Sequence, residues 1–342
     1  MKKSIAFGAL VAIGIGASAL SSATAAELKP FTLAIGTKVL DTSQANNTSL
    51  PIATKCWENE GVDVTLQPTN SSAAMQAVLS GQADMVLMGP GAAVKARAKG
   101  APIKAVYMNM RKNFQFPVVL ESSDIKSIED FKGKTMGVVS YGAQLVSIIK
   151  GMIAEAGVGA QAVAALESGQ VDIWGTWDSQ IATAENMGLK LRRFSSPYAE
   201  KLKFGSSYFV RDDYVDTNPD LIVKVLRCVA QGTMMALENP EGTVATHFKV
   251  FPATKQSCVD DATATKAGLH IFQVRSEFLT KEEAEKWGEF PPQAVVDLVE
   301  FMSATEDLGG TVDPESLYTN QFIDQINDFD QDAVLKRAAE LN

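Results

Sequence analysis

A short passage occurs twice in this chain, and it restricts the fold more than any other feature of the sequence. Residues Ala74–Asp84 and Ala162–Asp172 are both rich in small apolar side chains, end in Ser-Gly-Gln-x-Asp and precede an apolar run. Glycine just past a helix end adopts the left-handed conformation without steric cost, so each copy predicts a helix, a tight turn and a buried strand. The recurrence predicts two similarly built α/β lobes, and a cleft between such lobes commonly holds a ligand.

The N-terminus has the three regions of a secretory signal peptide. Lys2 and Lys3 are basic, residues 5–20 are apolar, and Ala23–Ala26 supply small residues for cleavage. We therefore expect residues 1–26 to be removed and the mature protein to be exported to the periplasm. A retained membrane anchor is the alternative, although the apolar stretch is short for one.

Charge and cysteine content narrow the choice of partners. The formal charge of −9 argues against nucleic acid and anionic membranes as partners, but it does not describe a single pocket. Of the three cysteines, Cys228 and Cys258 both lie in the C-terminal third, and we favour a disulfide between them. Three free thiols, including that of Cys56, are the alternative.

Strand-like and helical segments alternate along the chain, which is typical of parallel sheets flanked by helices. Strands are expected at residues 31–35, 62–66, 85–88, 103–107, 134–139, 173–178, 189–191 and 208–210, and mainly helices from Asn218 onward. The copies differ in one respect. The stretch from Gly157 to Asp172 is eight residues shorter than that from Gly61 to Asp84 and has no strand-like run. One edge strand of the second lobe is therefore expected to be missing.

In their order and spacing, several segments make the chain similar to the solute-binding proteins of ABC importers. The branch concerned handles sulfonates, nitrate, taurine and thiamine-precursor pyrimidines. The segments that carry the resemblance are Glu60–Val64, Ser80–Asp84, Ser127–Val138, Gly169–Asp172 and Val210–Pro219.

The resemblance implies a two-lobe periplasmic-binding-protein fold of type II, in which each lobe is a mostly parallel sheet flanked by helices. Residues 27–116 would begin the first lobe, 117–209 would form the second, and 210–342 would return to the first and end in a helical tail. Two crossing segments, near Gln115–Val119 and Ser207–Asp212, would hinge the lobes shut on a ligand. The implied partners are a small-molecule ligand and an ABC permease in the inner membrane, and we expect a monomer.

Four loops at the carboxyl ends of predicted strands are candidates for binding, because open parallel sheets bind ligands there. The segment Ser140–Ala143 precedes a helix, whose free N–H groups favour an anionic group, and a capped helix start is the alternative. The turn at Gly89–Gly91 is an equally plausible structural break. The candidates are Thr37, Lys38, Gly89, Pro90, Gly91, Arg111, Ser140, Tyr141, Gly142, Ala143, Thr176, Trp177 and Asp178.

Individual side chains suggest individual roles. Trp177 would stack on a planar ligand, or else belong to the core. Asp178 would cap the following helix, or recognise a ligand amine. Arg111 would hold a carboxylate or sulfonate at two points, or lie in a solvated loop. Tyr107 is a further candidate.

The sequence carries few residues suited to catalysis. His247 and His270 are the only histidines, and we find no nucleophile elbow, phosphate loop or Cys-x-x-Cys pair. We therefore predict a binding protein without a cofactor or metal, and not an enzyme. A periplasmic enzyme on the same fold and a ligand-presenting subunit of a sensor are the alternatives, because fold alone does not decide function.

Overall fold

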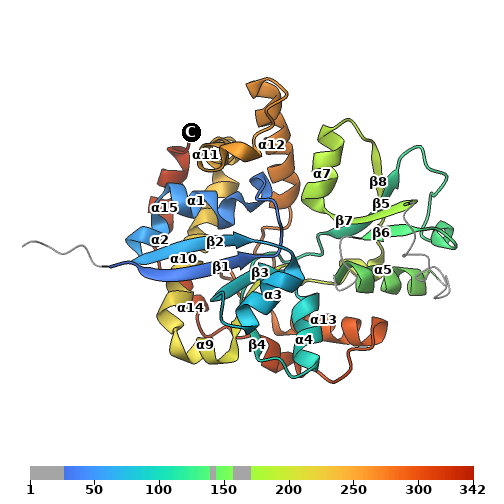
Figure 1. Ribbon diagram of the computed structural model, residues 1–342, viewed down its shortest axis with the longest axis horizontal. Coiled ribbons are helices and arrows are strands. Elements are labelled where there is room, and N and C mark those ends of the chain that lie inside the picture. Colours follow the sequence, from blue (N-terminus) through green and yellow to red (C-terminus); the bar gives the residue numbers. More distant parts are fainter. Residues whose placement is uncertain (1–26, 139–143, 157–170) are drawn as a thin grey trace, which may run out of the picture.

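The computed structural model describes residues 27–138, 144–156 and 171–342, which form two mixed sheets flanked by helices (Figure 1). In the first sheet the strand order is β2-β1-β3-β9-β4, and only β9 is antiparallel to its neighbours. In the second sheet the order is β6-β7-β5-β8. The strands are β1 (Lys29–Ile35), β2 (Val62–Pro68), β3 (Met85–Met88), β4 (Ile103–Met108), β5 (Gln115–Leu120), β6 (Met136–Val138), β7 (Ile173–Trp177), β8 (Leu191–Arg193) and β9 (Ser207–Arg211).

Helices cover both sheets and make up most of the C-terminal part, as predicted. Up to β9 they are η1 (Thr42–Asn47), α1 (Ser49–Ala53), α2 (Cys56–Asn59), α3 (Ser71–Leu79), α4 (Gly91–Ala98), η2 (Glu129–Phe131), α5 (Gln144–Glu155), α7 (Asp178–Asn186) and α8 (Pro197–Glu200). After β9 they are α9 (Asp212–Thr217), α10 (Pro219–Glu238), α11 (Pro240–Val250), η4 (Pro252–Thr254), α12 (Asp261–Ser276), α13 (Pro292–Thr305), η5 (Pro314–Leu317), α14 (Ile323–Ile326) and α15 (Gln331–Ala339). In the part that the structure describes, no helix is both long enough and apolar enough to span a membrane.

The aspartate that ends each repeat has the same structural role in both sheets. The Asp84 carboxylate accepts the Thr32 N–H at 2.7 Å, and the Asp172 carboxylate accepts the Thr135 N–H at 2.9 Å. Each aspartate also donates its own N–H to the carbonyl of that same threonine, at 3.0 and 2.8 Å. Gly81 has the expected positive φ of 77°, whereas the helix of the second copy lies outside the described residues. Each aspartate therefore joins the start of the strand that follows its repeat to the neighbouring strand, at the middle of β1 in the first sheet and just before β6 in the second.

The expected loss of one edge strand stays a prediction, because the stretch that would carry it is not among the described residues of the second sheet. Its outermost described strand is β6, which pairs in parallel with β7, whereas the corresponding β1 of the first sheet has β2 on its outer side. The shortened stretch itself, residues 157–162, lies outside the described residues.

The chain crosses between the sheets at residues 109–114 and 201–206, which is a few residues from the predicted positions. Gln115–Val119 lie inside β5, and Ser207–Arg211 form β9. Their apolar, β-branched and aromatic side chains are better buried in a sheet than exposed in a connection. The two crossings run side by side, since the Asn109 and Met110 N–H groups donate to the Ser206 carbonyl at 2.9 and 3.0 Å.

The disulfide joins Cys56 to Cys228, so the predicted pairing of Cys228 with Cys258 is wrong. The bonded cysteines lie on α2 and α10, with Cα atoms 5.7 Å apart, whereas Cys258 is exposed and free. Beside the disulfide, the Trp57 indole N–H donates to the Val225 carbonyl at 3.2 Å. Proximity in sequence was a poor guide because α10 packs against the N-terminal helices η1, α1 and α2, which brings Cys56 beside Cys228.

Candidate functional site

Two of the predicted binding loops leave neighbouring strands of the first sheet. Ile35 of β1 lies opposite Leu87 of β3, so the loops that follow these parallel strands begin side by side. The Gly36 N–H donates to the Leu87 carbonyl at 2.9 Å, and a Cβ atom at Gly36 would lie 2.8 Å from the Ser71 hydroxyl oxygen. Only glycine fits here without displacing a neighbour. Thr37 and Lys38 follow this close contact directly, and Lys38 is exposed.

The second of these loops forms the start of α4. Pro90 occupies the N-cap and Gly91 is the first helical residue, with both residues buried. No side chain caps this helix, so its first-turn N–H groups lack the partner that a capping residue would supply. The loop therefore presents backbone donors and the positive end of the helix dipole.

The end of β7 brings together Thr176, Trp177 and Asp178. Thr176 is buried, and its hydroxyl has no hydrogen-bond partner among the described residues. Trp177 is half-buried, and it occupies the N-cap of α7. The interpretation of Asp178 as that cap is therefore wrong, since Asp178 is the first helical residue.

The carboxylate of Asp178 is bound by an arginine from the C-terminal part of the chain. Its two oxygens accept hydrogen bonds from Arg275 Nε and Nη2 at 2.6 and 2.7 Å, and both side chains are buried. Burial alone would lower the pKa of Arg275, but the Asp178 carboxylate raises it above its usual value. The Arg275 guanidinium also lies 5.6 Å from the centre of the Phe114 ring, in the first crossing segment.

Asp41 brings the first sheet into this cluster. It follows the Thr37–Lys38 loop, caps η1 through Ser43 and interacts electrostatically with Arg275 and Asp178. Burial raises the pKa of the Asp41 carboxyl, although hydrogen bonds from Ser43 and the charge of Arg275 oppose this shift. Loops from the two sheets thus approach one another around a single guanidinium.

Arg275 was missed by sequence reasoning, but the sequence of α12 contains a signal for it. The buried residues of this helix recur at helical spacing, and Arg275 continues the series Ala264, Ala267, Gly268, Ile271 and Phe272. A charged residue on an apolar stripe is normally buried only with a partner. The partner's identity could not be deduced, because Asp178 is 97 residues away.

Two helices of the C-terminal part, α12 and α13, each contact one helix that follows a strand of the first sheet and one that follows a strand of the second sheet. α12 contacts both η1 and α7, and α13 contacts both α4 and α5 (Figure 1). Near the end of α13, the Glu306 carboxylate lies 3.2 Å from Lys95 Nζ of α4 and accepts a hydrogen bond from the Ser147 hydroxyl of α5 at 2.7 Å. Lys150 Nζ of α5 lies 3.8 Å from the same carboxylate. The two sides are therefore bridged at α12 and at α13.

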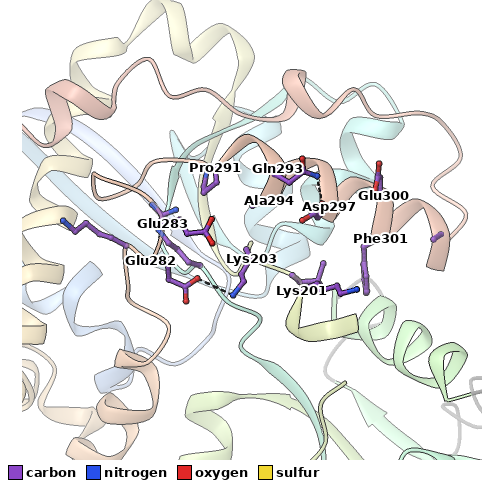
Figure 2. A pocket seen from close by; sticks show the side chains of 14 residues that line it. Lys201, Lys203, Glu282, Glu283, Pro291, Gln293, Ala294, Asp297, Glu300 and Phe301 are labelled. Carbon is purple, nitrogen blue, oxygen red and sulfur yellow. Dashed lines mark hydrogen bonds and ion pairs between the residues drawn. The ribbon is translucent and has the colours of Figure 1, made fainter. Parts of the chain in front are cut away.

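Not all of the remaining predicted residues lie near the cluster around Arg275. Ser140–Ala143 lie outside the described residues, although β6, which precedes them, ends at Val138 opposite Gly175 of β7. Tyr107 is buried, 5.7 Å from the Tyr208 ring. Arg111 lines a different cavity, of about 610 Å³, whose lining includes none of the other predicted residues (Figure 2).

The chain matches one family model and is similar in sequence to proteins named as binding proteins. Residues 56–243, more than half of the chain, match the family described as NMT1/THI5 like. A Brucella abortus protein named as a binding protein is 25% identical over 228 residues, which cover 62% of this chain and 69% of that protein.

Solved structures share the fold at low sequence identity. The alkanesulfonate-binding protein SsuA from Xanthomonas axonopodis, bound to MOPS, superposes with a TM-score of 0.60 at 15% identity and covers 86% of this chain and 100% of that one. The aliphatic sulphonate-binding protein SsuA from Escherichia coli gives 0.59 at 17% identity, covering 81% and 86%. The desulfurization enzyme DSZB gives 0.53 at 10% identity, covering 90% and 99%. The fold is that of the periplasmic binding proteins, and the chain belongs to the NMT1/THI5-like family.

Proposed function

We propose that this protein is an extracytoplasmic solute-binding protein that captures a small organic anion between two lobes and delivers it to an ABC importer. The observation that carries the proposal is the approach of strand-end loops from both sheets around Arg275, beside two adjacent crossing segments. In this fold, such loops can enclose a ligand when the lobes rotate about the crossings.

Hydrogen-bond donors at the carboxyl ends of β1 and β3 support an anionic ligand. The uncapped start of α4 presents N–H groups, and Lys38 is exposed in the neighbouring loop. Asp178 carries a compensating arginine, so the pair adds no net charge. Relatives with this fold are named as sulfonate-binding proteins, which makes a sulfonate our first choice of ligand.

A thermal-shift panel of sulfonates, carboxylates, nitrate and pyrimidines, followed by calorimetry, tests the ligand class. A ligand at 100 times its Kd should stabilise the folded protein by about 2.7 kcal/mol. Lys38→Gln should weaken binding of an anionic ligand, whereas Lys99→Gln, an equal charge change at the exposed end of α4, should not. If no compound in the panel raises the melting temperature, the proposed ligand class is wrong.

Binding without catalysis is the second part of the proposal. It is supported by the name of the Brucella relative, whereas an enzyme with the same fold shows that the fold does not decide the matter. Mass spectrometry of a bound ligand after prolonged incubation is the test. Conversion of the ligand to product would replace the transport proposal with the enzymatic alternative.

Export through the signal peptide of residues 1–26, a monomeric state and a permease partner complete the proposal. N-terminal sequencing of protein from the periplasmic fraction should begin near Glu27. Co-purification with an inner-membrane permease would support transport, while co-purification with a receptor would support the sensor alternative.

A further inference from the structure

Two arginines are buried to the same degree, but only one of them has a carboxylate close to its guanidinium. Arg111 and Arg275 are each 3% exposed. Arg275 is paired with Asp178, whereas among the described residues no carboxylate oxygen lies within 4.0 Å of the Arg111 guanidinium. Arg111 Nη1 lies 3.6 Å from Met108 Sδ, and Nη2 donates to the Lys286 carbonyl at 3.4 Å. Arg111 therefore lacks the close carboxylate partner that Arg275 has in Asp178. Burial of its charge without such a partner is energetically unfavourable.

Arg111 lines the cavity of about 610 Å³ shown in Figure 2, which is in the size range of small-molecule sites. Its walls come from both crossing segments, from the loop at residues 281–283 and from α13. Of the 14 residues drawn there, Arg111 alone is both charged and buried. The deepest charge of this cavity is therefore positive.

The acidic residues of the cavity lie at its rim, and two of them are engaged by neighbours. Glu282 lies 2.8 Å from Lys112 Nζ and 3.5 Å from Lys203 Nζ. The Asp297 carboxylate accepts a hydrogen bond from Gln293 at 2.7 Å (Figure 2). Glu283 and Glu300 are exposed, as are Lys201, Lys203 and Lys281. The rim thus carries four carboxylates and three lysines whose charges largely offset one another, and Arg111 is the buried charge that an occupant of the cavity would meet.

We propose that this cavity is an accessory site for a small oxyanion, held by Arg111 and distinct from the ligand site between the strand ends. A guanidinium offers a planar pair of donors that matches the oxygens of a sulfonate, sulfate or carboxylate. Burial lowers the pKa of Arg111, although electrostatic interactions with Tyr107, Glu289 and Glu282 partly oppose this shift. Because both crossing segments contribute walls, an occupant would contact the segments about which the lobes rotate.

The test compares the mature wild-type protein with Arg111→Met and Trp177→Ala in thermal-shift and calorimetric titrations. The probes are sodium sulfate, methanesulfonate and acetate, each against sodium chloride of matched ionic strength. The wild type and Trp177→Ala should gain stability from an oxyanion, whereas Arg111→Met combined with Trp177→Ala, which weakens the strand-end site as well, should not. Without oxyanion, Arg111→Met should melt about 2 °C or more above the wild type, since it removes an unpaired buried charge.

Two results would overturn the proposal. One is an unchanged oxyanion response in Arg111→Met, which would place the binding elsewhere. The other is loss of stability in Arg111→Met together with no oxyanion effect on the wild type, which would make Arg111 structural. Should Arg111→Met not fold, Arg111→Lys keeps the charge without the planar fork and should weaken oxyanion binding about tenfold. Loss of the response in Trp177→Ala but not in Arg111→Met would instead identify the strand-end site.

Discussion

At the scale of single residues, the pairing of Asp178 with Arg275 is the best-defined interaction near the proposed ligand site. Both side chains are buried, and each Asp178 oxygen has its own guanidinium donor. Such a pair contributes little net stability compared with apolar residues, but losing one member leaves the other charge buried alone.

Asp178→Asn should therefore destabilise the folded protein by about 3–5 kcal/mol, measured by chemical denaturation. The matched control is Asp213→Asn, which disrupts the exposed pair with Arg211 and should cost no more than about 1 kcal/mol. Combining Asp178→Asn with Arg275→Met should restore much of the stability. Equal effects of the two single asparagine substitutions would show that the buried pair has no special cost.

His247 should make stability depend on pH. It is fully buried, with Nδ1 3.1 Å from the Ser49 hydroxyl and Nε2 3.2 Å from the Leu40 carbonyl, and burial lowers its pKa to about 4. Since an unfolded histidine titrates near pH 6.5, the unfolded state binds more protons between these values. The stability that the neutral ring contributes is complete above about pH 6.5 and is lost as the pH falls towards 4.

Denaturation at a series of pH values from 7.5 to 4.5 should show this loss in the wild type. It should reach about 3 kcal/mol once the pH is below 4. In His247→Gln that part of the pH dependence should disappear, whereas His270→Gln, a change at a partly exposed histidine, should retain it. A parallel pH profile in His247→Gln and the wild type would contradict the assignment.

At the scale of elements, the disulfide joins α2 to α10, two helices that lie far apart in the chain. It closes a sequence separation of 172 residues, and Cys228 is fully buried while Cys56 is nearly so. A cross-link over so long a segment restricts the unfolded chain strongly, which stabilises the folded state by comparison.

Replacing both Cys56 and Cys228 by alanine should lower the free energy of unfolding by about 2–5 kcal/mol, measured by denaturant titration. Cys258→Ala, at the exposed free cysteine, is the control and should change little. Reductant should reproduce the effect in the wild type but not in the double variant. Insensitivity of the wild type to reductant would mean that the disulfide does not form.

Elements were predictable wherever local residues decide them. The first copy of the repeat, the strands that both copies precede and the helical C-terminal part agree with the sequence pattern, because glycine stops and apolar periodicity act over a few residues. The crossing segments were misplaced by a few residues because a run such as Phe116–Val119 is indistinguishable locally from a connection. The disulfide was mispaired because its formation depends on which distant helices pack together.

At the scale of the whole molecule, α12 and α13 determine how the two sheets are held relative to one another. Arg275 of α12 binds Asp178 at the start of α7. At the other end of α7, the Asn186 side chain donates to the Ala267 carbonyl of α12 at 2.9 Å. α13 leads into Glu306, which joins α4 to α5. Rotation of the lobes in the proposed transport cycle would have to break or slide these contacts.

Glu306→Gln should weaken the bridge at α13. We expect a loss of about 1 kcal/mol in stability and a larger radius of gyration in small-angle scattering of the ligand-free protein. Glu300→Gln, an exposed change on the same helix, should leave both quantities unaltered. Identical scattering from Glu306→Gln and the wild type would show that this bridge does not hold the lobes together.

The sequence by itself determined the α/β class, the duplicated unit, the shortened second copy and the strand ends where loops leave each sheet. These follow from residue periodicity and from turns that only a few residue types can make. Tertiary structure alone decided that Asp178 pairs with Arg275, that Cys56 bonds to Cys228, and that Arg111 lines a cavity of its own. Each of these depends on residues far apart in the chain, whose charges and thiols acquire partners only when packing has brought the helices together.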